Sequence, residues 1–192
     1  MQVTSLAIPD VLLLTPERFG DARGCFSEIW HAGRFAAAVG YPVAFVQDNL
    51  SRSAPGVLRG LHYQRVEPQG KLVRVVRGRI FDVAVDLRRD SLTFGAHVAA
   101  ELSDDNGCQL WLPPGFAHGF LVLDGPADVL YKVTTHYHPA SEQVLSWNDP
   151  ALAIAWPLAA EPLLSARDRA GLPLAACEPL LANGRDAPDM TR

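Results

Sequence analysis

The chain has 192 residues, of which 48% are hydrophobic and 20% charged, a composition typical of a soluble globular protein. This length predicts a single domain over residues 1–192, whose polar end, about residues 183–192, we expect to be frayed. The net charge of −4 argues against a general nucleic-acid binder, which needs a basic face. It leaves room for a small anionic ligand, because two or three local arginines or lysines suffice to bind a diphosphate.

The cysteines and the first residues indicate the compartment. Cys25, Cys108 and Cys177 are far apart and form no C-x-x-C pair, so neither a disulfide framework nor a structural zinc site is expected. The N-terminus lacks the basic start and apolar run of a signal peptide. No apolar segment reaches the ~18 residues that a membrane helix needs. We therefore predict a cytoplasmic protein with reduced cysteines.

The first quarter of the chain contains short elements. Apolar residues predict short strands at residues 11–14 and 25–30. The alanine-rich residues 32–39 predict a helix, which Gly40 and Pro42 end.

Strand-forming runs dominate the middle of the chain. From residue 43 to about residue 137, runs of Val, Phe, Leu and Ile alternate with Gly, Pro, Asp and Asn. Many short strands without intervening helices predict an all-β sandwich or barrel rather than a parallel α/β sheet. Further on, residues 165–170 predict a single helical turn.

One strand pattern is especially regular. In residues 81–87, apolar residues alternate with polar or small ones, which predicts a strand with one packed face and two acids, Asp82 and Asp86, on the other. An apolar run precedes this strand, and Gly78-Arg79 separates the two. We interpret that pair as the tight turn of a hairpin.

Two histidines, His62 and His118, lie in apolar segments beside glycines. With an ordinary pKa of ~6.5, imidazole can take up and return protons near neutral pH. From the local sequence alone, a hydrogen-bonded core histidine is as good an interpretation. Strict alternation also places Arg59 and His62 on opposite strand faces. If both serve one site, the strand must bulge at Gly60.

Other side chains give weaker signals. Tyr131 and Tyr137 are six residues apart, which places both phenols on one face of an extended strand. Lys71 opens a strongly apolar strand, whereas Asp168 has the local context of a surface acid. His62 lacks a second histidine two residues away, so we predict no metal site. No nucleotide-cofactor loop or serine-hydrolase elbow is present.

Several motifs in the same order resemble those of the dTDP-4-dehydrorhamnose 3,5-epimerase family, cupin-fold enzymes of deoxysugar synthesis. The resemblance extends over about residues 19–174. Its motifs lie at residues 21–28, 47–51, 56–64, 71–73, 81–88, 114–120, 131–132, 147–150 and 165–168. The resemblance implies a cupin-type β-barrel, or jelly roll, with short peripheral helices.

The resemblance also implies a reaction. The substrate would be a dTDP-linked 4-keto-6-deoxyhexose, whose C3 and C5 hydrogens are acidic because both carbons flank the C4 ketone. By family match, His62 is the base, Asp168 holds its imidazole, and Tyr131 donates a proton to the opposite face. Lys71, with Arg59 nearby, would stabilise the enolate. The product would be dTDP-4-dehydro-L-rhamnose.

The same resemblance assigns substrate contacts. The matching residues are Arg23, Phe26, Glu28, Gln47, Asp48, Asn49, Arg59, His118, Tyr137, Glu142 and Arg167. Two positions depart from common family members, because Arg167 replaces a lysine and His136 replaces a tyrosine. The family implies no metal, no organic cofactor, and a homodimer whose N-terminal segments cross between subunits.

Three alternatives remain open at this point. A related enzyme could invert only C3 or only C5. A metal-dependent cupin could use His62 and His118 together, and a non-catalytic module could only bind the sugar nucleotide. The role of Asp82 is also open, since it could orient His118, pair with Lys71 or face solvent.

Overall fold

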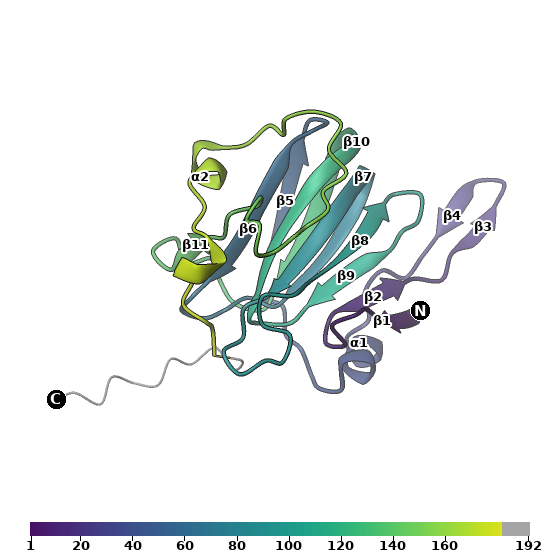
Figure 1. Ribbon diagram of the computed structural model, residues 1–192. Helices are drawn as coiled ribbons and strands as arrows, with labels where there is room; N and C mark the ends of the chain where they lie inside the picture. Colours follow the sequence, from purple (N-terminus) through teal and green to yellow (C-terminus); the bar gives the residue numbers. More distant parts are fainter. Residues whose placement is uncertain (182–192) are drawn as a thin grey trace.

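The computed structural model describes residues 1–181, so the predicted tail at residues 183–192 lies outside the described residues. Strands dominate the fold (Figure 1). In chain order the elements are β1 (Gln2–Ser5), β2 (Leu12–Thr15), β3 (Phe19–Asp21), β4 (Gly24–Phe26), α1 (Ala32–Val39), β5 (Gln47–Ser53), β6 (Leu58–Gln64), β7 (Lys71–Asp86), β8 (His97–Ser103), β9 (Gln109–Leu112), β10 (Phe116–Val133), β11 (Glu142–Val144), α2 (Ala166–Arg169) and a 3-10 turn, η1 (Leu174–Ala176).

Two long antiparallel strands, β7 and β10, form the centre of the fold (Figure 1). The first half of β7 pairs with β9 and its second half with β8. Likewise, β10 pairs with β6 at its start and with β5 at its end. The sheet has nine strands in the order β1-β2-β9-β7-β10-β6-β11, with β5 paired to β10 and β8 paired to β7. Because β7 and β10 each pair with different strands along their two halves, the sheet folds over itself into two layers. This arrangement confirms the predicted all-β class.

Apolar residues fill the space between the layers and cover both outer faces. The inner core includes Val75 and Ile80 of β7 together with Val129 of β10. On one outer face, the C-terminal segment packs Leu145 and Leu180 against the second half of β7. On the other, α1 buries Phe35 against the β7 and β9 side chains Leu72 and Trp111. Segments from the two ends of the chain therefore cover the two outer faces of the barrel.

The burial of both faces of β7 corrects the expectation for residues 81–87. The strand has two buried faces, and both Asp82 and Asp86 are fully buried. Each acid has a buried or half-buried partner, since Asp82 contacts His118 and Asp86 binds Arg88. The face with the two acids also holds Ala84 and points into the inner core, while the C-terminal segment covers the apolar face with Val83 and Val85. Alternation identified the two faces correctly but could not show that the acid-bearing face is the inner one.

The hairpin expected at Gly78-Arg79 is also wrong, because β7 continues through this point. Gly78 has φ +82°, and a Cβ atom there would lie 2.7 Å from the carbonyl oxygen of Pro126. The register with β10 becomes irregular at the same place. The glycine therefore marks a bend where the strand passes from one layer to the other, not a turn.

Among the short elements, the helix at residues 32–39 is confirmed, with Gly40 as its left-handed C-cap. The helical turn within residues 165–170 is confirmed as α2. The strand expected at residues 25–30 is much shorter, because β4 ends at Phe26.

Strands β3 and β4 pair only with each other. They form a hairpin that projects away from the barrel (Figure 1). Its aromatic side chains Phe19 and Phe26 are 56% and 70% exposed.

Strands β6 and β10 approach each other unusually closely at two glycines. A Cβ on Gly60 would lie 2.6 Å from the Cα of Gly119, and Gly60 has φ +116°. The register places His62 opposite His118, but Arg59 opposite Phe120, so β6 holds one extra residue. A one-residue slip moves a side chain to the other face of a strand. The bulge required for Arg59 and His62 to share a site is therefore present at Gly60.

We predict that Gly60→Ala lowers the free energy of unfolding by about 3 kcal/mol or more, because the new Cβ meets backbone atoms and the φ angle disfavours alanine. Gly56→Ala is the matched control. Gly56 also has positive φ, +74°, but nothing lies within 4 Å of a Cβ there, so only about 1–2 kcal/mol is expected. Urea unfolding of both variants measures the difference, and equal losses would contradict a role for close strand contact.

Candidate active site

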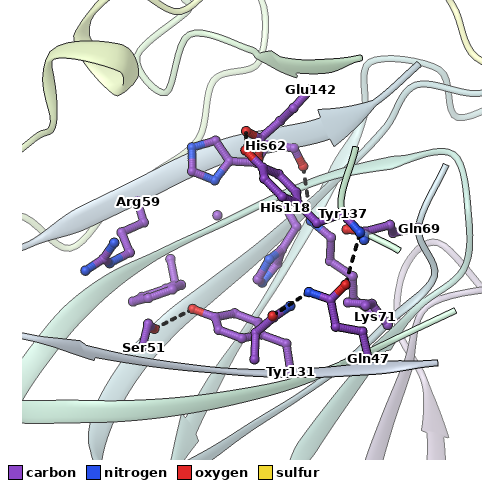
Figure 2. A pocket seen from close by; sticks show the side chains of 14 residues that line it. Gln47, Ser51, Arg59, His62, Gln69, Lys71, His118, Tyr131, Tyr137 and Glu142 are labelled. Atoms are coloured by element: carbon purple, nitrogen blue, oxygen red, sulfur yellow. Dashed lines mark hydrogen bonds between the residues drawn. The ribbon is translucent and has the colours of Figure 1, made fainter. Parts of the chain in front are cut away.

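A pocket of about 280 Å³ lies where β5, β6, β7 and β10 meet the loop before β11 (Figure 2). Its polar side chains come from segments that are far apart in the sequence. The lining residues are Gln47, Asn49, Ser51, Arg59, His62, Gln69, Lys71, His118, Gly119, Phe120, Tyr131, Val133, Tyr137 and Glu142.

The strand period explains part of this lining. Alternate residues of β5, namely Gln47, Asn49 and Ser51, face the pocket. Tyr131 reaches it from β10, which ends at Val133. Tyr137 therefore lies in the following loop, and the expectation of two phenols on one strand face is wrong. Its backbone N–H donates to Gln47 Oε1 at 3.1 Å, which brings its side chain to the pocket all the same.

His62 is paired with Asp168, whose carboxylate Oδ1 lies 2.6 Å from His62 Nε2. The acid sits on α2, and Ser165, which caps this helix, donates to its Oδ2 at 2.8 Å. Asp168 is only 4% exposed, so its local sequence was misleading about its burial. Burial opposes ionisation, but the hydrogen bonds from His62 and Ser165 outweigh it and hold the pKa of Asp168 below its ordinary value.

The charge of Asp168 determines which ring nitrogen of His62 carries the proton. An ionised carboxylate can only accept, so His62 Nε2 must carry a proton. In the neutral ring, Nδ1 is then the basic nitrogen. A carboxylate in this position also stabilises the imidazolium that forms when the ring takes up a proton.

A second histidine–aspartate pair lies deeper. His118 Nε2 is 2.7 Å from Asp82 Oδ1, and both residues are buried. Burial lowers the pKa of His118, and Asp82 opposes this only in part. Of the three roles left open for Asp82, the structure shows the contact with His118 and excludes exposure to solvent.

Lys71 brings a cation to the same pocket. Its Nζ donates to the backbone oxygen of His62 at 3.3 Å. Burial lowers the pKa of Lys71 to about 8, while Glu142 and Asp82 raise it slightly. The amine is thus mostly protonated at neutral pH but poorly hydrated, and a cation in such a place interacts strongly with a developing negative charge.

Tyr131 lies across the pocket from His62 (Figure 2). Burial raises the pKa of its phenol to about 12. The phenol therefore keeps its proton at neutral pH and can act as a donor. The hydroxyl lies 2.6 Å from Ser51 Oγ, a residue that falls in a recognised motif but to which the sequence assigned no role.

Polar contacts join the remaining predicted residues at the edge of the pocket. Tyr137 donates to Glu142 Oε2 at 2.9 Å, and Arg167 forms an ion pair with the same carboxylate. Arg167 therefore acts on the pocket through Glu142 rather than by lining it. Arg59 donates to Ser53 Oγ at 2.9 Å, which holds its guanidinium beside the pocket.

Besides Arg167, four of the predicted contacts lie outside this pocket. Arg23, Phe26 and Glu28 lie on or next to the projecting β3–β4 hairpin. There Arg23 pairs with Asp21, with 90% of its own side chain exposed. Asp48 binds Lys132 at 2.9 Å and faces away, since alternation turns it to the other side of β5. The chain by itself therefore does not bring these residues to His62.

Two further findings concern residues 1–181. Residues 1–181 contain no group of three or more His, Cys, Asp or Glu side chains that could hold a metal ion. No helix in this part of the chain is both long and apolar enough to cross a membrane.

Comparison with known proteins agrees with these geometric features. A sequence model described as dTDP-4-dehydrorhamnose 3,5-epimerase matches residues 5–176. The chain belongs to this family. The predicted family and enzyme class, a carbohydrate epimerase, are thereby confirmed.

Individual relatives are similar over most of their length. The dTDP-4-dehydrorhamnose 3,5-epimerase of Pseudomonas aeruginosa is 57% identical over 89% of this chain and 94% of its own. The dTDP-4-dehydrorhamnose 3-epimerase of Streptomyces niveus is 42% identical over 97% of this chain and 87% of its own. The crystal structure of a 3,5-epimerase of Legionella pneumophila, in complex with dTDP-4-keto-L-rhamnose, matches with a TM-score of 0.90 and 47% identity over 92% of this chain and 94% of that one. This structural match confirms the predicted cupin-type fold.

The pKa of Lys71 yields a test of its predicted role. The cationic form is present below about pH 8 and is lost above it, so we expect turnover of the dTDP-sugar to fall as pH rises through about 8. In Lys71→Arg the charge persists to higher pH, and the decline should shift upward by about two pH units or more. Lys132→Arg, outside the pocket, is the matched control and should keep the original profile. An unchanged profile in Lys71→Arg would assign the alkaline limb to another group.

Proposed function

We propose that this protein inverts C3 and C5 of dTDP-4-dehydro-6-deoxy-D-glucose to give dTDP-4-dehydro-L-rhamnose. The observation that carries the proposal is the placement of His62, oriented by Asp168, on one side of the pocket and of the protonated Tyr131 on the other. Inversion at a carbon requires a base on one face and an acid on the opposite face, and the pocket supplies both.

The steps follow from the chemistry of these groups. His62 removes the hydrogen from a carbon next to the ketone, and Asp168 stabilises the resulting imidazolium. The negative charge moves to the ketone oxygen, where protonated Lys71 stabilises it. Tyr131 then protonates the carbon from the opposite face. Before the second carbon reacts, the imidazolium of His62 gives its proton to solvent and the phenolate of Tyr131 takes one up from solvent. The same steps at the second carbon then complete the conversion.

Relatives support inversion at both carbons. The relative named as a 3,5-epimerase is 57% identical, whereas the one named as a 3-epimerase is 42% identical. The Legionella neighbour carries dTDP-4-keto-L-rhamnose, the compound proposed here as product. Because the Streptomyces niveus relative is named as a 3-epimerase, inversion of a single carbon is the alternative function, and it needs a direct test. A cytoplasmic location remains a prediction from the sequence.

We infer further that two copies assemble into a homodimer in which each β3–β4 hairpin serves the pocket of the other copy. The hairpin carries Arg23 and Phe26, predicted substrate contacts that do not reach the pocket of their own chain. Its exposed aromatic rings are suited to packing against a second surface. Leu50 of β5 and Val76 of β7 are exposed as well. In the sheet, Leu130 of β10 lies between Leu50 and Arg74, whose buried Nε has no hydrogen-bond partner within residues 1–181.

The proposed reaction is tested by NMR of dTDP-4-keto-6-deoxyglucose incubated with the enzyme in D2O and excess chelator, with a downstream reductase to trap product. We expect deuterium at both C3 and C5 and an L-rhamno product. His62→Ala should abolish both. Deuterium and inversion at one carbon would establish the single-carbon enzyme. Activity that returns only with added metal would support a metal-dependent cupin, and binding without exchange would support a non-catalytic module.

The dimer inference is tested by subunit complementation. Arg23→Ala and His62→Ala should each be poorly active at low substrate concentration. Mixed dimers contain one pocket with an intact His62 and an intact partner hairpin. Refolding an equal mixture should therefore restore about a quarter of wild-type activity, since half of the dimers are mixed and each has one intact pocket. A mixture no more active than its components would contradict the crossed arrangement.

A further inference from the structure

We propose that Ser51 is a positioning residue for Tyr131: its hydroxyl donates a hydrogen bond to the phenol oxygen, turns the phenol proton toward the substrate, and stabilises the phenolate left after proton transfer. This inference rests on the proposed function, because it requires Tyr131 to be the proton donor.

The geometry places the two hydroxyls together on adjacent strands. Ser51 lies on β5 and Tyr131 on β10, where the register puts Ser51 opposite Val129 and Tyr131 opposite Asn49. The two side chains are thus diagonal neighbours on one face of the sheet, a distance that a tyrosine can span. Their oxygens are 2.6 Å apart, and both residues line the pocket (Figure 2).

This bond decides where the phenol proton can go. A phenol has one proton to donate, and its oxygen can also accept. The rings of His118 and Phe120 pack around Tyr131, with centroids 6.1 and 6.4 Å away. Within residues 1–181, Ser51 is the one group hydrogen-bonded to this hydroxyl. When Ser51 donates, the proton of Tyr131 is free for the carbon of the substrate.

The same bond addresses the energetic difficulty of using a buried tyrosine as an acid. Burial raises the pKa of Tyr131, and the hydrogen bond from Ser51 and the charge of Arg59 offset this only in part, so that the pKa is about 12. During reprotonation the O–H bond of Tyr131 breaks and a C–H bond forms at the enolate carbon. The phenolate then regains a proton from water. Hydrogen bonds to charged groups are stronger than those between neutral groups, so Ser51 stabilises the product of this step more than its reactant.

Ser51→Ala separates this role from a general structural one. Proton removal by His62 does not need Tyr131, so deuterium exchange at the substrate should persist. Inversion does need Tyr131, and its rate should fall by about 10- to 100-fold, the factor that one hydrogen bond to a charged group is worth. The ratio of inversion to exchange, read from one NMR time course in D2O, should therefore fall. Ser51→Thr keeps the hydroxyl and should restore most of that ratio.

A double substitution completes the test. In Tyr131→Phe, exchange without inversion is expected, and adding Ser51→Ala should leave the exchange rate of that variant unchanged. Wild-type inversion at both carbons, together with this behaviour of Tyr131→Phe, keeps the proposed function intact whatever Ser51→Ala does. The Ser51 inference is overturned if Ser51→Ala lowers exchange and inversion equally, if it leaves both unchanged, or if it lowers the exchange rate in the Tyr131→Phe background. Thermal unfolding and dTDP binding of each variant identify any loss that comes from misfolding.

Discussion

The contact between Gly60 and Gly119 determines where the reactive side chains of this protein lie. Two backbones that approach so closely leave no room for a Cβ on either strand. The resulting bulge turns Arg59 and His62 toward the same side. In a regular strand, two residues three positions apart point to opposite faces. It also exposes the backbone N–H of Gly60 to Asp168, at 3.4 Å. One packing constraint thus determines the positions of His62, Asp168 and Arg59 together.

Depth of burial distinguishes the two histidine–aspartate pairs. Both have the same contact, a ring nitrogen within 2.7 Å of a carboxylate oxygen. The side chain of His62 is 30% exposed at the pocket, whereas that of His118 is 5% exposed. Desolvation disfavours a charged imidazole, so His118 is suited to stay neutral. The partly exposed His62 can carry a positive charge beside an ionised Asp168 at lower cost, as a base in proton transfer must.

Local sequence was sufficient where local physics decides structure. The alanine-rich run and Gly40 specified α1, and Ser165 with Asp168 specified the start of α2. It failed where distant segments decide. Gly78 looked like a turn because the close approach of residues 126–127 cannot be seen in its neighbourhood. For Asp168, only its place in a motif singled it out, since burial against His62 depends on a segment 106 residues away. The same limitation hid Ser51, whose significance comes from an adjacent strand.

The projecting hairpin has a consequence for how this enzyme behaves in dilute solution. In the crossed dimer proposed here, an isolated copy keeps His62, Asp168 and Tyr131 but lacks the arginine and aromatic ring that a second copy supplies. Dissociation would then weaken affinity for the nucleotide while leaving the proton-transfer groups in place. Specific activity at low substrate would depend on enzyme concentration, and the nucleotide itself, by bridging two chains, would favour association.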